Sequence, residues 1–168
     1  MASTRWIRFE HAGKIGFGTL EGERIHCHEG DMFSGARATG ETVELAQVSV
    51  LTPCVPTKMP ALWNNFRSLA EKLGQAIPPE PLYFIKGANS YCAHGQPILA
   101  PTSHDGRVVY EGELAVVIGK RAKAVSVADA PAHIFGYSCA NDVTAPELLK
   151  RDESFAQWTR AKSFDTFG

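Results

Sequence analysis

The stretch YEGELAVVIG, residues 110–119, says most about the fold and the site of this chain. It predicts a β-strand, in which alternate side chains lie on the same face. Glu111 and Glu113 therefore point the same way, and the apolar run after them predicts a strand that is buried on both faces. Two carboxylates on a buried face repel each other and lose hydration, so they need a cation or a proton between them. A hard divalent ion with oxygen ligands meets that need. The alternative is an edge strand with both glutamates in water.

A third carboxylate follows a second predicted strand. Residues 135–140 form a short apolar run that ends at Asn141 and Asp142. Polar residues at the end of a buried strand often line a site, so Asp142 is a candidate ligand beside the two glutamates. The alternative interpretation is a helix cap or a turn, because Asn-Asp before a helix-like stretch is ordinary capping chemistry.

Length and composition exclude several classes of protein. The chain has 168 residues, which suits one domain or one domain with a small appendage. Its 17 basic and 18 acidic residues form no basic run, so a nucleic-acid partner is not expected. No apolar stretch approaches the ~20 residues that span a membrane, and the N-terminus lacks the apolar core of a signal peptide. The four cysteines have no metal-ligand spacing, which favours reduced thiols in a cytoplasmic protein.

The N-terminal part, residues 1–57, is predicted to be a β region. Alternating residues and turn signals indicate short strands at residues 6–10, 15–20, 24–28 and 41–51. A hairpin turn is expected at residues 21–23. The pair Gly16 and Gly18 lacks the third glycine and the helix of a nucleotide loop, so it indicates close strand packing. His26 and His28 share a strand face without a third ligand nearby, which favours a surface strand.

The middle of the chain predicts a linker, a helix and a strand. Three prolines punctuate residues 53–60, and residues 61–73 have apolar residues at helical spacing, with Gly74 as the helix end. Leu69 is expected on the buried face of that helix. Residues 82–86 predict a strand that ends at Lys86, which either faces a ligand or is solvated. Further along, one or two helical turns are expected at residues 127–134, and helix or loop at 146–158.

Three motifs in this order resemble the fumarylacetoacetate hydrolase family. They are EGELAVVIG at residues 111–119, GY followed by ANDVTA within residues 136–145, and AKSFDTFG at residues 161–168. The resemblance covers residues 58–168, and the N-terminal β region is also similar to the family's N-terminal part. It implies a mixed, β-rich α+β fold with mixed sheets rolled around a metal site. It also implies a catalytic domain over residues 58–168 and a homodimer.

The resemblance also implies site residues and a chemistry. Glu111, Glu113 and Asp142 match the family's ligands for Mg²⁺ or Mn²⁺, and Lys162 matches its catalytic, substrate-contacting lysine. Lys86 is a second candidate substrate contact. Members of the family cleave, decarboxylate, isomerise or hydrate small 2-oxo acids, so such an acid is the expected substrate. A metal chelated by a 2-oxo carboxylate stabilises the enolate that forms when a neighbouring bond breaks.

The chain departs from the family pattern at the water-activating dyad. Leu69 and Lys72 stand where the family's hydrolases carry histidine and glutamate, and neither can act as the base. Pro146 and Leu149 replace a common arginine and glutamine. The family also continues past the last motif, so a fold that is incomplete at the C-terminus is expected. Decarboxylation or isomerisation therefore fits better than hydrolysis, and a non-catalytic chain that keeps the fold is the alternative.

Overall fold

The computed structural model describes residues 3–152 and 154–168, which separate into two compact units. The first unit comprises Met1–Val55, Ala93–Gln96 and Glu113–Ala140. The second comprises Pro56–Cys92, Pro97–Gly112 and Asn141–Gly168. Strands dominate the first unit, the second unit combines a strand pair with short helices, and strands prevail over helices in the described residues, which confirms the predicted β-rich α+β class. The predicted division of the chain after residue 57 stays a prediction.

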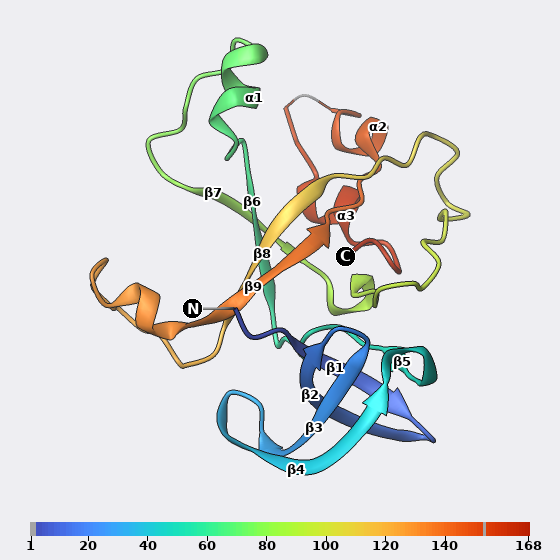
Figure 1. The fold of residues 1–168 in the computed structure, drawn as a ribbon. Coiled ribbons are helices and arrows are strands. Elements are labelled where there is room, and N and C mark those ends of the chain that lie inside the picture. The colour runs from blue at the N-terminus through green and yellow to red at the C-terminus, as the bar shows by residue number, and fades with distance from the viewer. Residues whose placement is uncertain (1–2, 153) are drawn as a thin grey trace. The chain divides into compact units, whose positions relative to one another are not determined.

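The first unit contains an antiparallel five-stranded sheet with the order β4-β3-β2-β1-β5 (Figure 1). Its strands are β1 (Trp6–His11), β2 (Lys14–Glu21), β3 (Arg24–Asp31), β4 (Ser34–Glu44) and β5 (Ser49–Val50). A short 3₁₀ helix, η1 (Leu45–Gln47), joins the last two strands. The strands predicted at residues 6–10, 15–20 and 24–28 and the hairpin turn are confirmed, whereas the predicted strand region 41–51 divides into the end of β4, which already begins at Ser34, the helix η1 and the short strand β5.

Close packing explains the glycines of β2. A Cβ atom on Gly18 would lie 2.2 Å from the backbone oxygen of His26 on β3, so only glycine lets the two strands approach. A Cβ on Gly16 would lie 3.0 Å from the Phe9 ring. The sequence interpretation of this pair as strand packing is confirmed. His26 and His28 lie on β3 of this sheet, as expected for a strand.

The motif strand β8 (Gly112–Ile118) pairs with β9 (Ile134–Asn141) beyond the short helix η3 (Ala130–His133). The exposure alternates along β8: Glu113 is half-buried, whereas Leu114, Val116 and Ile118 are 65%, 47% and 56% exposed. The prediction of a strand buried on both faces is therefore wrong. The side chains of a strand alternate between two faces, and in the described part of the chain only the face that carries Glu113 is packed.

The second unit begins with a strand where a helix was predicted. Strand β6 (Met59–Trp63) pairs antiparallel with β7 (Leu82–Lys86), and the helix α1 is confined to Arg67–Lys72. The Trp63 ring stacks on the Trp158 ring with 4.4 Å between centroids, and Asn64 adopts a positive φ of 51° that ends the strand. Strand pairing and aromatic stacking thus override the helical spacing, and Pro60 lies in a strand rather than in a linker.

Leu69 is not a core residue. Its side chain is 52% exposed, and Leu62, Phe66 and Leu73 are also about half exposed, at 47%, 49% and 57%. The predicted buried helix face is therefore wrong, because α1 is short and packs through Ala70.

The core of the second unit lies near its C-terminal part. It consists of the buried side chains of Val143, Ala145, Leu148, Ala161 and Phe167. These residues come from the segment after β9, from α2 (Pro146–Leu149) and from α3 (Trp158–Lys162). A 3₁₀ helix, η2 (Ala88–Ser90), follows β7. All four cysteines lie in the described part of the chain, and none of them is joined to another in a disulfide. Among the described residues, every helix is too short or too polar to span a membrane.

Candidate metal and substrate site

The ammonium group of Lys162 is the centre of a buried polar cluster in the second unit. Its Nζ donates to Glu111 Oε2 at 2.7 Å, to Asp142 Oδ2 at 2.6 Å and to Thr144 Oγ1 at 2.7 Å. Lys162 is 3% exposed although it carries a charge, and Asp142 is 8% exposed. Burying a lysine is unfavourable unless its charge is paired, and here three oxygens satisfy its three N–H donors.

A second buried lysine binds the other side of Asp142. Lys86, at the end of β7, donates from Nζ to Asp142 Oδ1 at 2.5 Å and to the backbone oxygen of Lys162 at 2.7 Å. It is 3% exposed. Burial lowers the pKa of Lys86 from its ordinary value, and the hydrogen bond and charge of Asp142 oppose that shift.

Backbone pairing places the two carboxylates side by side. The Asp142 N–H donates to the Glu111 backbone oxygen at 2.9 Å, and the Glu111 N–H donates to Asn141 Oδ1 at 3.0 Å. One step further, Val109 and Thr144 form an antiparallel bridge. The helix-cap alternative for Asp142 is wrong, because α2 begins at Pro146 and Ala145 is its N-cap residue.

The loop after β7 holds the Lys162 motif in place. The Gly87 N–H donates to Ser163 Oγ at 2.9 Å, and Asn89 Nδ2 donates to the backbone oxygen of Ser163 at 2.9 Å and to Asp165 Oδ1 at 2.8 Å. Lys162 leaves α3 at the helix end, with its ammonium 5.4 Å from the centroid of the Phe84 ring. The fixed backbone around Ser163 therefore directs the Lys162 side chain toward the carboxylates.

Sequence reasoning did not single out Thr144 or Asn89. Thr144 is 2% exposed and accepts a hydrogen bond from Lys162. A signal for it was present, because residues 142 and 144 are two apart in an extended segment and so share a face. Asn89 has no comparable signal, since its partners are 74 and 76 positions away in the sequence.

The predicted metal ligands are brought together only in part. Glu111 and Asp142 meet at one ammonium in the second unit, whereas Glu113 belongs to the first unit, on the half-buried face of β8. Among the described residues, no three His, Cys, Asp or Glu side chains form a group that could hold an ion. The donors themselves fit Mg²⁺ or Mn²⁺, because carboxylate and hydroxyl oxygens that already surround one cation are hard ligands. The three-carboxylate metal site stays a prediction.

The positions of the family's dyad lie on the short helix α1. Leu69 is exposed, and so is Lys72 at the end of the helix. A leucine has no titratable group, and the lysine is solvated. The described residues therefore provide no histidine–glutamate base at these two positions.

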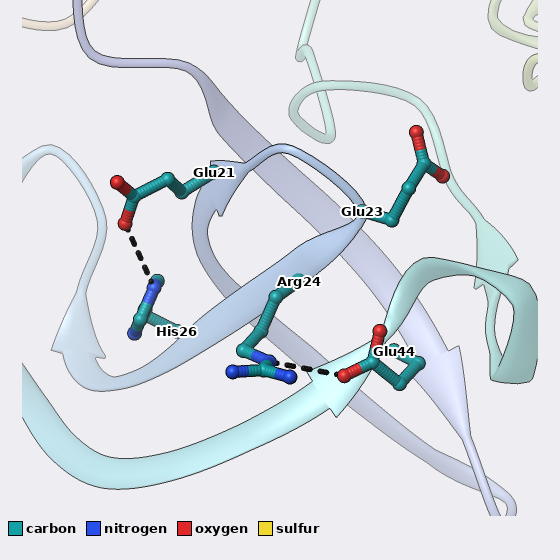
Figure 2. Close-up of a pocket in the computed structure, with 5 residues that line it drawn as sticks. All are labelled: Glu21, Glu23, Arg24, His26 and Glu44. Carbon is teal, nitrogen blue, oxygen red and sulfur yellow. Dashed lines mark hydrogen bonds and ion pairs between the residues drawn. The ribbon is translucent and has the colours of Figure 1, made fainter.

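A shallow hollow on the five-stranded sheet is a separate feature (Figure 2). It is lined by Glu21, Glu23, Arg24, His26 and Glu44. Arg24 Nε lies 3.0 Å from Glu44 Oε1, and His26 Nε2 lies 3.3 Å from Glu21 Oε2. These pairs are exposed on the sheet surface, where ion pairs contribute little to stability. The exposed ion pair of His26 with Glu21 is typical of a surface strand, which is what the sequence predicted for His26.

The strands and the lysine–carboxylate cluster define a β-rich domain with a preorganised polar site. Comparison with known proteins shows its family. Residues 58–168 match the family described as "Fumarylacetoacetate (FAA) hydrolase C-terminal", and residues 4–53 match "Rv2993c-like, N-terminal". The chain belongs to the fumarylacetoacetate hydrolase family, and its fold is of that family's β-rich type.

Named relatives and solved structures agree with this assignment. The chain is 40% identical over 110 residues to "Oxaloacetate tautomerase fahd-1, mitochondrial" of Caenorhabditis elegans. This match covers 65% of the chain and 51% of that protein. The chain is 34% identical over 166 residues to "Oxaloacetate tautomerase YisK" of Bacillus subtilis, covering 88% and 54%. The crystal structure of 2-hydroxyhepta-2,4-diene-1,7-dioate isomerase from Mycobacterium marinum has a TM-score of 0.84 at 32% identity, covering 98% of this chain and 63% of that one. The chain thus spans about half the length of the relatives it matches.

Proposed function

We propose that this chain is the metal-binding part of an enzyme that isomerises a small 2-oxo acid, with oxaloacetate as the first candidate. The observation that supports this most directly is the Lys162 ammonium, held by Glu111 and Asp142 and buried away from water. Two relatives bear the name oxaloacetate tautomerase, and a structural neighbour bears the name of an isomerase.

The charges of the site favour an anionic substrate. Lys86 and Lys162 balance Glu111 and Asp142, so these four side chains are together neutral. A divalent ion would add two positive charges, and the third carboxylate, Glu113, would add one negative charge, so one positive charge would remain. That remaining positive charge attracts a carboxylate substrate into a site where burial strengthens the interaction.

Glu111, Glu113 and Asp142 are the residues that we propose to hold Mg²⁺ or Mn²⁺. When bound, such an ion polarises a carbonyl oxygen as a Lewis acid. Lys162 would donate a hydrogen bond to the oxygen on which negative charge develops as a 2-oxo acid passes to its enolate. A preorganised ammonium in a site of low water content stabilises that charge more than water does.

Isomerisation fits this chain better than hydrolysis. Keto–enol tautomerisation moves a proton between carbon and oxygen and consumes no water, so it does not require the activation of water by the dyad that Leu69 and Lys72 replace. A non-catalytic chain that keeps the fold is the second candidate. It is favoured by one observation, which is that the two lysines already neutralise Glu111 and Asp142 without a metal ion.

The test is the conversion of enol-oxaloacetate to its keto form, followed by the loss of enol absorbance with and without Mn²⁺. The expected result is Mn²⁺-dependent conversion that is removed by EDTA and by Lys162→Met. Conversion that equals the buffer rate, in a chain that still binds Mn²⁺, would favour the non-catalytic alternative.

We also propose a second copy of this chain as a partner. The family resemblance implies a homodimer, and the outward face of β8 presents exposed Leu114 and Val116. Light scattering of the purified chain tests this, and a mass equal to one chain at all concentrations would exclude it.

A further inference from the structure

We propose that Lys86 is a positioning residue that orients Asp142 for metal binding rather than a contact for substrate. The proposal rests on the metal site proposed above and adds a residue whose role is indirect. Its basis is the geometry of Lys86, whose ammonium donates to Asp142 Oδ1 and to the backbone oxygen of Lys162.

The two oxygens of Asp142 have different partners. Oδ1 accepts a hydrogen bond from Lys86, whereas Oδ2 accepts one from Lys162. Lys162 also contacts Glu111 Oε2, so Oδ2 is the oxygen that faces the other predicted ligand. Both oxygens are held by buried lysines, but only Oδ2 shares its lysine with Glu111, so the hydrogen bond from Lys86 keeps the Asp142 carboxylate turned with Oδ2 toward that second ligand. Lys86 thus selects Oδ2 as the metal-binding oxygen.

Lys86 cannot easily leave this position. It is 3% exposed, and the chain packs around its side chain. A Cβ atom on Gly168 would lie 2.8 Å from Lys86 Cε and 3.1 Å from Ser90 Oγ, so the backbone at Gly168 passes directly over the lysine stem. A buried lysine that has no room to turn toward solvent is held in one orientation, as expected for a positioning residue rather than for a mobile substrate contact.

The same ammonium also fixes Lys162. The Lys162 backbone oxygen is at the end of α3, where helix carbonyl groups have no partner within the helix. Its hydrogen bond from Lys86 measures 2.7 Å. Loss of Lys86 therefore loosens both the ligand Asp142 and the backbone that carries the Lys162 side chain.

Electrostatic repulsion alone predicts the opposite change in metal affinity when Lys86 is removed. The direction of the measured change therefore distinguishes the two effects. Removing a positive charge beside a cation site should strengthen cation binding. Removing a group that orients a ligand typically weakens metal binding by about 10- to 100-fold. Lys86 and Lys162 are matched for this comparison, because both are 3% exposed and both donate to Asp142.

The experiment is a Mn²⁺ titration of the 168-residue chain, followed by the electron paramagnetic resonance signal of free Mn²⁺ well below the melting transition of each variant. We expect Lys86→Met to weaken binding by about 10- to 100-fold. Lys162→Met should bind Mn²⁺ as tightly as the parent or more tightly, since its ammonium competes for Oδ2. Lys72→Met, at an exposed lysine of α1, should leave the affinity unchanged.

A second variant covers the case in which Lys86→Met does not fold. Lys86→Gln keeps an N–H donor for Asp142 without the charge, and it should lose less affinity than the methionine variant. A purely structural lysine would lower the melting temperature of the metal-free protein but leave the Mn²⁺ affinity of the folded protein at the parent value.

The possible outcomes separate this inference from the proposed function. If the parent chain binds Mn²⁺ and both Lys86 variants bind it equally or more tightly, the positioning role is wrong and the metal site stands. If the parent chain binds no Mn²⁺, the metal site is wrong and the role of Lys86 toward it is lost as well.

Discussion

Lys162 Nζ lies 2.6 Å from Asp142 Oδ2, although the two residues are 20 positions apart and both are buried. This pair joins the strand-end motif to the Lys-Ser-Phe-Asp motif. The Asp142 carboxylate is thus the shared partner of two buried lysines, Lys86 and Lys162.

Glu113→Gln should weaken Mn²⁺ binding, because the substitution removes one of the three carboxylates proposed as ligands. In the parent chain, Mg²⁺ at 10 to 100 times its Kd should raise the free energy of unfolding by about 1–3 kcal/mol by mass action. Isothermal titration and thermal melts with Mg²⁺ or EDTA measure both effects. Equal affinity in the variant and the parent would remove Glu113 from the site.

Lys162→Met should lower kcat by about 10²–10³-fold, the cost of removing one electrostatic donor to a developing anion. Metal affinity should stay the same or increase, because the ammonium opposes the cation. Steady-state kinetics with Mn²⁺ at saturation measures the first effect. Turnover that survives while Mn²⁺ binding collapses would show that Lys162 acts on the metal and not on substrate.

Asp142→Asn should destabilise the fold by about 3–5 kcal/mol, because it leaves the buried Lys86 ammonium without its charged partner and leaves the buried Lys162 ammonium paired with Glu111 alone. The matched control is Glu147→Gln, which removes the exposed pair between Glu147 and Arg107 and should cost at most about 1 kcal/mol. Urea unfolding of both variants gives the comparison. Equal losses would mean that the Asp142 cluster contributes no more than a surface pair.

Phe167→Ala should cost about 3–5 kcal/mol of stability, since Phe167 is fully buried in the core of the second unit. Leu69→Ala should stay within about 0.5 kcal/mol of the parent, because Leu69 is 52% exposed. Chemical denaturation of the two variants measures the difference. A large loss at Leu69 would mean that this side chain is covered in solution.

The turn between β3 and β4 should respond to pH through Asp31. Its carboxylate accepts hydrogen bonds from the Phe33 N–H and the Ser34 hydroxyl, both at 2.9 Å, and these bonds lower the pKa of Asp31. A lowered pKa in the folded state means that the carboxylate contributes stability above its unfolded pKa. That contribution is lost as the pH falls through the folded pKa. Asp31→Ala should therefore lower the melting temperature at neutral pH and match the parent in strong acid; a gap that persists there would argue against the carboxylate.

Local sequence determined the N-terminal sheet. The hairpins around Gly13 and Gly22 combine glycines of positive φ with alternating strands, and all of this information lies within a few residues. The positions of Glu111, Asp142 and Lys162 were also readable, because each lies in a motif with a strong family resemblance. The alternation of exposure along β8 also follows the strand period, with Glu113 half-buried and Gly112 and Leu114 exposed.

Tertiary structure alone decided the rest. Residues 61–73 have helical spacing, yet residues 61–63 form a strand because β7, about 20 positions away, provides backbone partners and the Trp158 ring stacks on Trp63. The sequence predicts for Lys86 only that it lies at the end of a strand, because its hydrogen-bond partners are 56 and 76 positions away. The local sequence fixes the period and the turns, because these depend on neighbouring residues. Which charges meet in the interior depends on packing between distant segments, and the burial of Lys86 and Lys162 on either side of Asp142 is a property of the folded chain.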